Sequence, residues 1–262
     1  MTRFFELEVQ KKRKENKIQK LLYLCLGQEA VYASVSEVFK KPKVFFQHRG
    51  HGAFLCFGGN SIKLRDELLG LKTGTNKGMG GSPCIVDKSK GIYGHVGLIG
   101  DQVPVSAGFS LINKNTTTIC FFGDGAAEED YVLATLGFAA HRKLKILFVC
   151  DDNDLSVLTK IKDRRHWKLA EVAKSFGLAS ADITDDPITI FETIQKLKNK
   201  LPALINIKTC REYWHEGYKK DKQKASDWNR FEIEKNFFKK NHQIFFDKTI
   251  SYYKKWAQKI WN

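Results

Sequence analysis

The sequence has 262 residues, enough for one large domain with a buried core. Hydrophobic residues make up 42% and charged residues 28% of the chain, which argues against a wholly disordered protein. Lys and Arg outnumber Asp and Glu by 44 to 29, a net charge of +15. This charge indicates either a lysine-rich surface or an anionic partner. We favour the surface, because the basic residues are spread out and no nucleic-acid recognition motif accompanies them.

The cysteines and the N-terminus bear on the cellular compartment. Residues 1–17 are charged and lack the apolar stretch of a secretory signal, and no apolar run reaches the length of a membrane span. We therefore expect a cytoplasmic protein with reduced thiols that binds neither membrane nor nucleic acid. The cysteines stand singly, without CxxC pairs or zinc-ligand spacing, at positions 25, 56, 84, 120, 150 and 210.

The first 112 residues are predicted to alternate helices with glycine-rich loops. The glycines match neither G-x-x-x-x-G-K-[ST] nor G-x-G-x-x-G, so we reject P-loop and Rossmann sites. The expected elements are a charged helix over 3–18, two helical stretches around Gly27 within 19–39, a strand at VFF (44–46), a turn at HRGHG (48–52), a helix over 61–74 and a long loop entering a helix within 77–112.

Residues 117–153 carry the strongest structural pattern in the sequence. It consists of an apolar run, a GDG turn that opens a helix, a second apolar run and a cluster of oxygen-bearing side chains. This pattern predicts two buried parallel strands joined by a crossover helix, and hence an α/β fold with a mostly parallel sheet flanked by helices. Asp124 and Asn153 would then lie side by side at the carboxyl ends of the strands, where such sheets bind ligands.

The residue types at this edge favour a cation that carries a phosphate. Gly123 and Gly125 allow a sharp turn and a close approach, and the amides that open the next helix point at an anion. The oxygens of Asp124 and Asn153 are hard donors suited to Mg²⁺, which shares its shell with phosphate oxygens. A metal-bridged diphosphate therefore fits.

These motifs resemble a known family. GDG with an Asn 29 positions after its Asp is similar to the thiamine diphosphate (ThDP) signature. The similarity runs from about residue 3 to about residue 218, and its motifs follow the order seen in α subunits of the decarboxylating component of 2-oxo acid dehydrogenases. They are LGQEA (26–30), HRGHG (48–52), KGMGGS (77–82) and GLIGDQVPVSAG (97–108).

The resemblance implies ThDP and Mg²⁺ as cofactors and assigns residues to them. Mg²⁺ would be held by Asp124, Asn153 and the backbone carbonyl of Leu155. His51 either contacts the substrate or forms hydrogen bonds with the backbone of its own loop. His215 is either an active-site or a structural histidine. The residues expected to contact ThDP are His48, Arg49, Gly97, Ile99, Asp124, Gly125, Ala126 and Asn153.

The chain departs from the family pattern at three positions. Tyr23 stands where relatives have a substrate-contacting His, and His48 stands where many have Tyr. Cys84 occupies the place of a His in the family's GGSMH. Relatives carry a mobile loop at 160–167. In this chain the loop is either simply exposed to solvent or closes over the cofactor. In the second case Arg164 or Arg165 could pair with a substrate carboxylate.

The C-terminal part is predicted to contain a helix over 187–200 and a buried strand over 201–210. A ThDP-binding domain over 1–218 would be followed by a basic, aromatic helical tail over 219–262. The tail opens with a hydrophilic connector over 219–227. Its apolar residues recur three and four apart, so it should pack on the core or on a partner.

The resemblance implies an α subunit that decarboxylates a 2-oxo acid together with a β subunit, as an α₂β₂ assembly. The β subunit would supply the Glu that activates the cofactor, and the acyl unit would pass to a lipoyl group on an acyltransferase. Two alternatives stay open: a ThDP-dependent carboligase or acyl-transfer subunit of a specialised sugar or acetoin pathway, and a catalytically dead basic binding protein.

Overall fold

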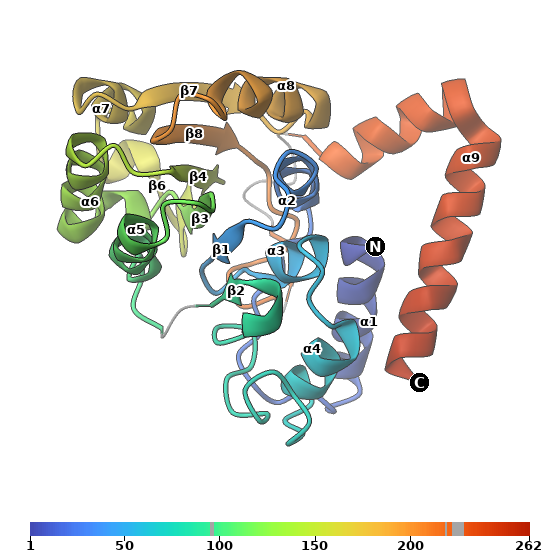
Figure 1. The fold of residues 1–262 in the computed structure, drawn as a ribbon. Coiled ribbons are helices and arrows are strands. Elements are labelled where there is room, and N and C mark those ends of the chain that lie inside the picture. The colour runs from blue at the N-terminus through green and yellow to red at the C-terminus, as the bar shows by residue number, and fades with distance from the viewer. Residues whose placement is uncertain (95–96, 218, 222–227) are drawn as a thin grey trace.

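A six-stranded sheet, parallel at every pairing, runs through the molecule in the order β2-β1-β3-β4-β8-β7 (Figure 1). This confirms the predicted α/β fold. The computed structural model describes residues 1–94, 97–217, 219–221 and 228–262. The strands of the sheet are β1 (Lys43–Phe45), β2 (Ile92–Tyr93), β3 (Thr118–Gly123), β4 (Ile146–Asp152), β7 (Ala179–Thr184) and β8 (Ala203–Lys208); a separate antiparallel pair joins β5 (Leu155–Ser156) to β6 (Thr159–Lys160).

Helices cover both faces of the sheet (Figure 1). One face carries α2 and α8, with α1, α3 and α4 packed beyond them, and the other carries α5, α6 and α7. The helices are α1 (Thr2–Lys14), α2 (Glu29–Ser36), α3 (His51–Cys56), α4 (Ser61–Leu68), α5 (Gln102–Ile112), α6 (Asp130–His141), α7 (Leu169–Ser175), α8 (Pro187–Leu197) and α9 (Arg230–Trp261), with short 3₁₀ turns η1 (Lys88–Lys90), η2 (Ala126–Glu128) and η3 (Ile161–Asp163).

The central strands are apolar on both faces because each face meets helices. In β3, Ile119 and Phe121 belong to the core on the α2 and α8 side, whereas Cys120 and Phe122 belong to the core under α5 and α6. All four side chains are at most 2% exposed. Continuous apolar runs of this kind are typical of parallel strands buried between two helical layers. The runs that the sequence shows before Asp124 and Asn153 therefore form the centre of the sheet.

The register of β3 and β4 fixes the position of the residues that follow them. The two strands pair in parallel from Thr118 opposite Ile146 to Gly123 opposite Asp151, and η2 and α6 make the crossover between them. Both strands therefore end at the same edge of the sheet. Asp124 directly follows β3, and Asn153 directly follows β4.

The prediction of a helical stretch just before Gly27 was wrong. Residues 19–26 form no helix, and α2 begins only at Glu29. Within this stretch, the backbone N–H of Cys25 donates to the carboxylate of Glu6 on α1, at 3.0 Å. A tertiary contact thus replaces the helical hydrogen bond. The predicted turn at 48–52 also differs in part, because α3 begins at His51.

The C-terminal tail is one long helix with a bend. Helix α9 has a non-helical backbone at His242, leaves the body of the protein and runs back beside α1 (Figure 1). There Trp256 and Trp261 pack around Phe5, with ring centroids 6.3 and 5.2 Å apart. The predicted boundary at Tyr218 and most of the connector, residues 222–227, lie outside the described residues. In the described part of the chain, no helix carries an apolar stretch long enough to cross a bilayer.

A buried glutamate shapes the glycine-rich loop after α4. The carboxylate of Glu67 is fully buried and accepts four backbone N–H groups, at distances between 2.6 and 3.1 Å. The donors are Asn76, Gly78, Gly80 and Gly81. An unpaired buried N–H is costly. This one side chain therefore supplies the hydrogen-bond acceptors that regular secondary structure would otherwise provide for the loop. The KGMGGS motif is therefore a segment folded around an anion of its own chain.

We predict that Glu67→Ala lowers the free energy of unfolding by about 3 kcal/mol or more, because it leaves several buried donors without an acceptor. Urea denaturation followed by circular dichroism measures this change. Glu192→Ala, on the exposed side of α8, is the matched control and should shift stability by less than about 0.5 kcal/mol. Equal losses in the two variants would contradict the anchoring role of Glu67.

Candidate active site

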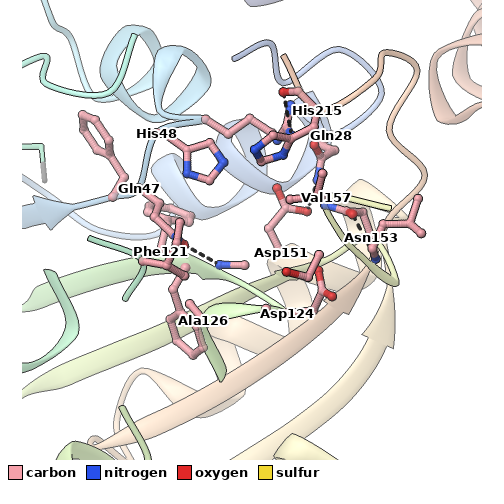
Figure 2. Close-up of a pocket in the computed structure, with 18 of the residues that line it drawn as sticks. Gln28, Gln47, His48, Phe121, Asp124, Ala126, Asp151, Asn153, Val157 and His215 are labelled. Carbon is pink, nitrogen blue, oxygen red and sulfur yellow. Dashed lines mark hydrogen bonds between the residues drawn. The ribbon is translucent and has the colours of Figure 1, made fainter. Parts of the chain in front are cut away.

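A pocket opens at the sheet edge where β3 and β4 end (Figure 2). Its volume is about 190 Å³. Pockets that enclose a whole drug-sized ligand usually measure about 300–1,000 Å³, so this one encloses part of such a molecule. The lining residues are Gln28, Tyr32, Phe46, Gln47, His48, Arg49, Ile99, Phe121, Phe122, Gly123, Asp124, Gly125, Ala126, Asp151, Asn153, Leu155, Ser156, Val157 and His215.

Asp124 and Asn153, predicted to lie side by side, both line this pocket (Figure 2). Asp124 is 1% exposed, and burial raises the pKa of its carboxyl to about 6. The nearby Asp152 raises this pKa further, while Arg164, which donates to the Asp124 carboxylate, opposes the shift. The side-chain oxygen of Asn153 accepts the N–H of Leu155 at 3.2 Å. One carboxylate and one amide side chain thus lie in the same pocket, at two neighbouring strand ends.

The GDG turn packs closely against the segment that follows Asn153. A side chain at Gly125 would place its Cβ 2.7 Å from the hydroxyl oxygen of Ser156, so a larger residue there would require Ser156 to shift. The N–H of Gly123 donates to the side chain of Gln47 at 2.9 Å. Ala126, the next predicted contact, lines the pocket and opens the short turn η2. The turn is therefore held on both sides of Asp124.

A second buried carboxylate in the pocket was not predicted as a site residue. Asp151 accepts hydrogen bonds from Gln28 at 2.5 Å, Thr209 at 2.7 Å and Tyr32 at 3.0 Å. Burial outweighs these bonds and raises the pKa of Asp151 to about 6. The run CDDN in the sequence contains this residue, but only the fold shows that Asp151, within β4, faces these three donors.

Three rings form one corner of the site. Tyr23 packs edge-on against His48 and His215, with centroids 4.5 and 5.2 Å apart, and the two histidine rings are 5.4 Å apart. Arg49 donates to the carbonyl oxygens of Leu24, at 2.7 Å, and His215, at 3.3 Å. The structure therefore brings the predicted residues His48, Arg49 and His215 together in the lining of the pocket, where Figure 2 labels the two histidines.

The electrostatics of this corner keep His215 neutral. Burial lowers the pKa of its imidazole to about 4, and the positive charges of Arg49 and Arg211 lower it too. Burial and Arg211 also lower the pKa of Arg49. Near neutral pH the corner therefore offers guanidinium charge beside an uncharged imidazole, which can either donate or accept a hydrogen bond.

Two predicted residues lie elsewhere. His51 is fully buried outside the pocket, where its ring nitrogens contact Glu6 and Ser82, each at 2.9 Å, so a role in contacting substrate does not follow from its position. Its partners are side chains rather than the loop backbone that the sequence suggested as the alternative. Gly97 is exposed and does not line the pocket, whereas Ile99 does.

The loop after Asn153 reaches back to the GDG turn. The sequence left open whether Arg164 or Arg165 pairs with a substrate carboxylate. In the structure both pair with Glu128, at 2.6 and 3.0 Å, and Arg164 also contacts Asp124. The partners of both arginines are thus carboxylates of the protein itself. The sequence carries no signal for this pairing, because it joins residues about 36 positions apart.

A family model described as the dehydrogenase E1 component matches residues 1–244. The chain belongs to this family. Curated E1 relatives include the pyruvate dehydrogenase E1 component subunit alpha of Rickettsia bellii, which is 28% identical over 74% of this chain and 63% of its own length. The mitochondrial subunit alpha of Pisum sativum is 32% identical over 82% of this chain and 56% of its own length. The chain thus spans somewhat under two thirds of these relatives.

Solved structures with the same fold include transketolases. The enzyme of Campylobacter jejuni superposes with a TM-score of 0.56 at 17% identity, over 68% of this chain and 32% of its own. The transketolase of Leishmania mexicana gives 0.54 at 16% identity, over 73% and 30%. At such identities the likeness concerns the fold alone, and it agrees with the parallel sheet described above.

We predict that the imidazole of His215 titrates near pH 4, and that Arg49→Gln raises its pKa towards the ordinary value of about 6.5, because a nearby positive charge is removed. Imidazole NMR signals followed from pH 3.5 to 8 measure both values. Arg142→Gln, exposed just after α6, is the control and should leave the pKa unchanged. A His215 that titrates near 6.5 in the unaltered chain would contradict this description of the corner.

Proposed function

We propose that this E1-family chain is the α subunit of an enzyme that uses ThDP and Mg²⁺ to decarboxylate a 2-oxo acid. The observation that carries the proposal is that Asp124 and Asn153 follow adjacent strands and line one pocket. The relatives of this chain are named pyruvate dehydrogenase E1 component subunit alpha. Membership of the family and the parallel fold support it.

The donor set at the strand ends fits Mg²⁺. The ion prefers hard oxygen ligands and is commonly held by one or two carboxylates together with phosphate oxygens. Asp124 supplies a carboxylate, Asn153 an amide oxygen, and the backbone carbonyl of Leu155 would be the third protein ligand. No group of three His, Cys, Asp or Glu residues in the described ranges is placed to hold a metal. This argues against a zinc-type site.

The surroundings fit the diphosphate of ThDP. Gly125 lies close to the side chain of Ser156 and lines the pocket beside Asp124, so the backbone itself is exposed to a ligand there. Arg49 and His48 would contribute donors, and Ile99 would contribute apolar surface. When bound, ThDP supplies an electron sink for the carbon that loses CO₂. The residues of this chain bind and orient that group and exclude water from it.

The corner of rings would receive the substrate. Tyr23 and His48, two positions where the chain departs from its family, are in ring contact. Relatives have a His at the position of Tyr23, and many have a Tyr at the position of His48. This chain therefore keeps a phenol beside an imidazole, but at exchanged positions, and the imidazole of His48 lines the pocket. We propose that the neutral His215 holds a proton or accepts one at a ring nitrogen in this corner.

The site in this chain is half of a cofactor site. A pocket of about 190 Å³ leaves much of a molecule the size of ThDP uncovered. We propose that a β subunit covers the remainder and supplies the activating Glu, in an α₂β₂ assembly, and that a lipoyl group on an acyltransferase accepts the acyl unit. A cytoplasmic location is part of the proposal.

A second candidate is a ThDP-dependent carboligase or acyl-transfer subunit, for example in a sugar or acetoin pathway. The altered pair of Tyr23 and His48 favours it, because His48 lines the pocket that an acceptor would enter and packs against Tyr23. Reductive acylation of a lipoyl domain distinguishes the two reactions. A catalytically dead binding protein is disfavoured, because Asp124, Asn153 and Arg49 converge on one pocket.

We predict a pH dependence for Mg²⁺-assisted binding of ThDP. The pKa of Asp124 is raised to about 6, so below pH 6 a proton competes with the ion for the carboxylate. The Mg²⁺ concentration at half-maximal ThDP binding, measured by calorimetry, should therefore rise about tenfold per pH unit between 6 and 4.5 and level off above 7.

The variant Asp124→Asn provides the control for that titration. It keeps the shape of the side chain and removes its charge, so the fold should persist while ThDP affinity falls about a hundredfold or more, with no pH dependence between 5 and 8. An unchanged affinity in Asp124→Asn would exclude Asp124 as the ligand of the metal.

We also predict that the purified chain alone does not release CO₂ from pyruvate or a branched 2-oxo acid, and that turnover begins when a β subunit is added. The reason is that the activating Glu resides on the partner. A dye-reduction assay over a panel of 2-oxo acids measures this, with Asp124→Asn plus the β subunit as the inactive control. Turnover by the chain without a partner would overturn the assignment as an α subunit.

A further inference from the structure

The loop from β5 to α7 brings two adjacent arginines onto the GDG turn. Arg164 and Arg165 both donate to one oxygen of Glu128 on η2, at 2.6 and 3.0 Å. The side chains of the two arginines are 11% and 4% exposed, so both are largely withdrawn from water. Two buried cations thus reach the turn together, and Glu128 is the carboxylate that both contact.

The two arginines differ in how they meet Asp124. Arg164 donates to the carboxylate itself, and the side chain of Asp124 is only 2% exposed there. Arg165 donates to the backbone carbonyl of Asp124 at 2.9 Å, and its guanidinium packs over the ring of Trp167 at 4.5 Å. Among the described residues, Arg164 is therefore the cation that neutralises the buried carboxylate.

This contact places a guanidinium on the carboxylate expected to hold a divalent ion. A buried carboxylate without a counter-charge is strongly disfavoured, which explains why the chain supplies a cation of its own. A divalent ion on the same carboxylate brings positive charge close to Arg164, and two cations at a few ångströms in a buried site repel. The Nε of Arg164 is also buried without a hydrogen-bond partner among the described residues, so its present position is incompletely satisfied.

We propose that Arg164 is a placeholder cation. It holds the carboxylate of Asp124 in the unloaded chain and releases it when the divalent ion arrives with the cofactor, while Glu128 retains its guanidinium. The inference rests on the proposed function. The release breaks the contact between Arg164 and the carboxylate of Asp124. The hydrogen bond from Arg165 to the backbone carbonyl of Asp124 persists. Loading of the site and release of the loop from the Asp124 carboxylate are thereby coupled through one ion pair.

The test is a titration of the full-length chain with Mn²⁺ in the presence of ThDP, with free Mn²⁺ measured by electron paramagnetic resonance. Arg164→Gln should bind Mn²⁺ about tenfold more tightly than the unaltered chain, because a charge-assisted bond to the competing cation is lost. Arg165→Gln is the matched comparison and should tighten Mn²⁺ binding clearly less than Arg164→Gln, since Arg165 contacts the backbone carbonyl of Asp124 and not its carboxylate. Arg164→Lys keeps the charge and should stay within about threefold, which separates charge from packing.

A second readout follows the loop without measuring activity. Trypsin cuts after Lys and Arg, and the loop retains Lys160, Lys162, Arg165 and Lys168 in Arg164→Gln. In the absence of metal this variant should be cut in the loop several-fold faster than the unaltered chain, although it has one site fewer. Equal cleavage rates would contradict the tie between the loop and Asp124.

The outcomes separate this inference from the proposed function. Mn²⁺ retained by the unaltered chain but lost in Asp124→Asn supports the metal site. If Arg164→Gln then binds Mn²⁺ no more tightly, or more weakly, the placeholder role is overturned while the metal site stands. If the unaltered chain retains no Mn²⁺ that depends on Asp124, both proposals fail. Thermal melts of all variants confirm that the comparison is made between folded proteins.

Discussion

The parallel pairing of β3 with β4 is the constraint on which the site depends. Its register sets Gly123 opposite Asp151, so the residues that follow both strands converge on one edge. The pairing is fixed by strands that are apolar on both faces and enclosed by helices, and slippage by one residue would exchange the two cores. The geometry of the site is thus a consequence of packing far from it.

Convergence of the strand ends also concentrates negative charge, which the protein offsets differently at each carboxylate. Asp151 is surrounded by neutral donors, and Asp152 accepts hydrogen bonds from Asn206, at 3.0 Å, and from the N–H of Asp154, at 3.0 Å. Asp124 alone among these three has an ion pair with an arginine side chain in the described residues. Raised pKa values at Asp124 and Asp151 show that burial is incompletely compensated at this edge, despite a net charge of +15 for the whole chain. A cation bound here relieves that imbalance.

The centre of the fold could be predicted from the sequence, because its strands and turn have clear sequence patterns. Apolar runs on either side of a GDG turn implied β3, the crossover and β4, and hence the proximity of Asp124 and Asn153. Residues 19–26 were predicted to be helical because their apolar residues suit a helix. In the structure the N–H of Cys25 instead meets Glu6, a partner that only the tertiary fold provides.

The histidines and arginines of the site were harder to predict for the same reason. His51 and His48 lie three positions apart in one motif, yet one is buried against Glu6 and Ser82 and the other faces the pocket. The direction of α3, which begins at His51, separates them. Arg164 lay in a run of charges typical of a solvated loop, and its contact with Asp124 depends on how that loop folds back.

The most direct test of the account is a diffraction experiment on crystals of the chain, alone or with its β subunit, grown with ThDP and Mn²⁺. We expect an anomalous peak within coordination distance of the side-chain oxygens of Asp124 and Asn153, with the diphosphate beside the GDG turn. A peak elsewhere, or well-defined ThDP without an ion at these two side chains, would contradict it.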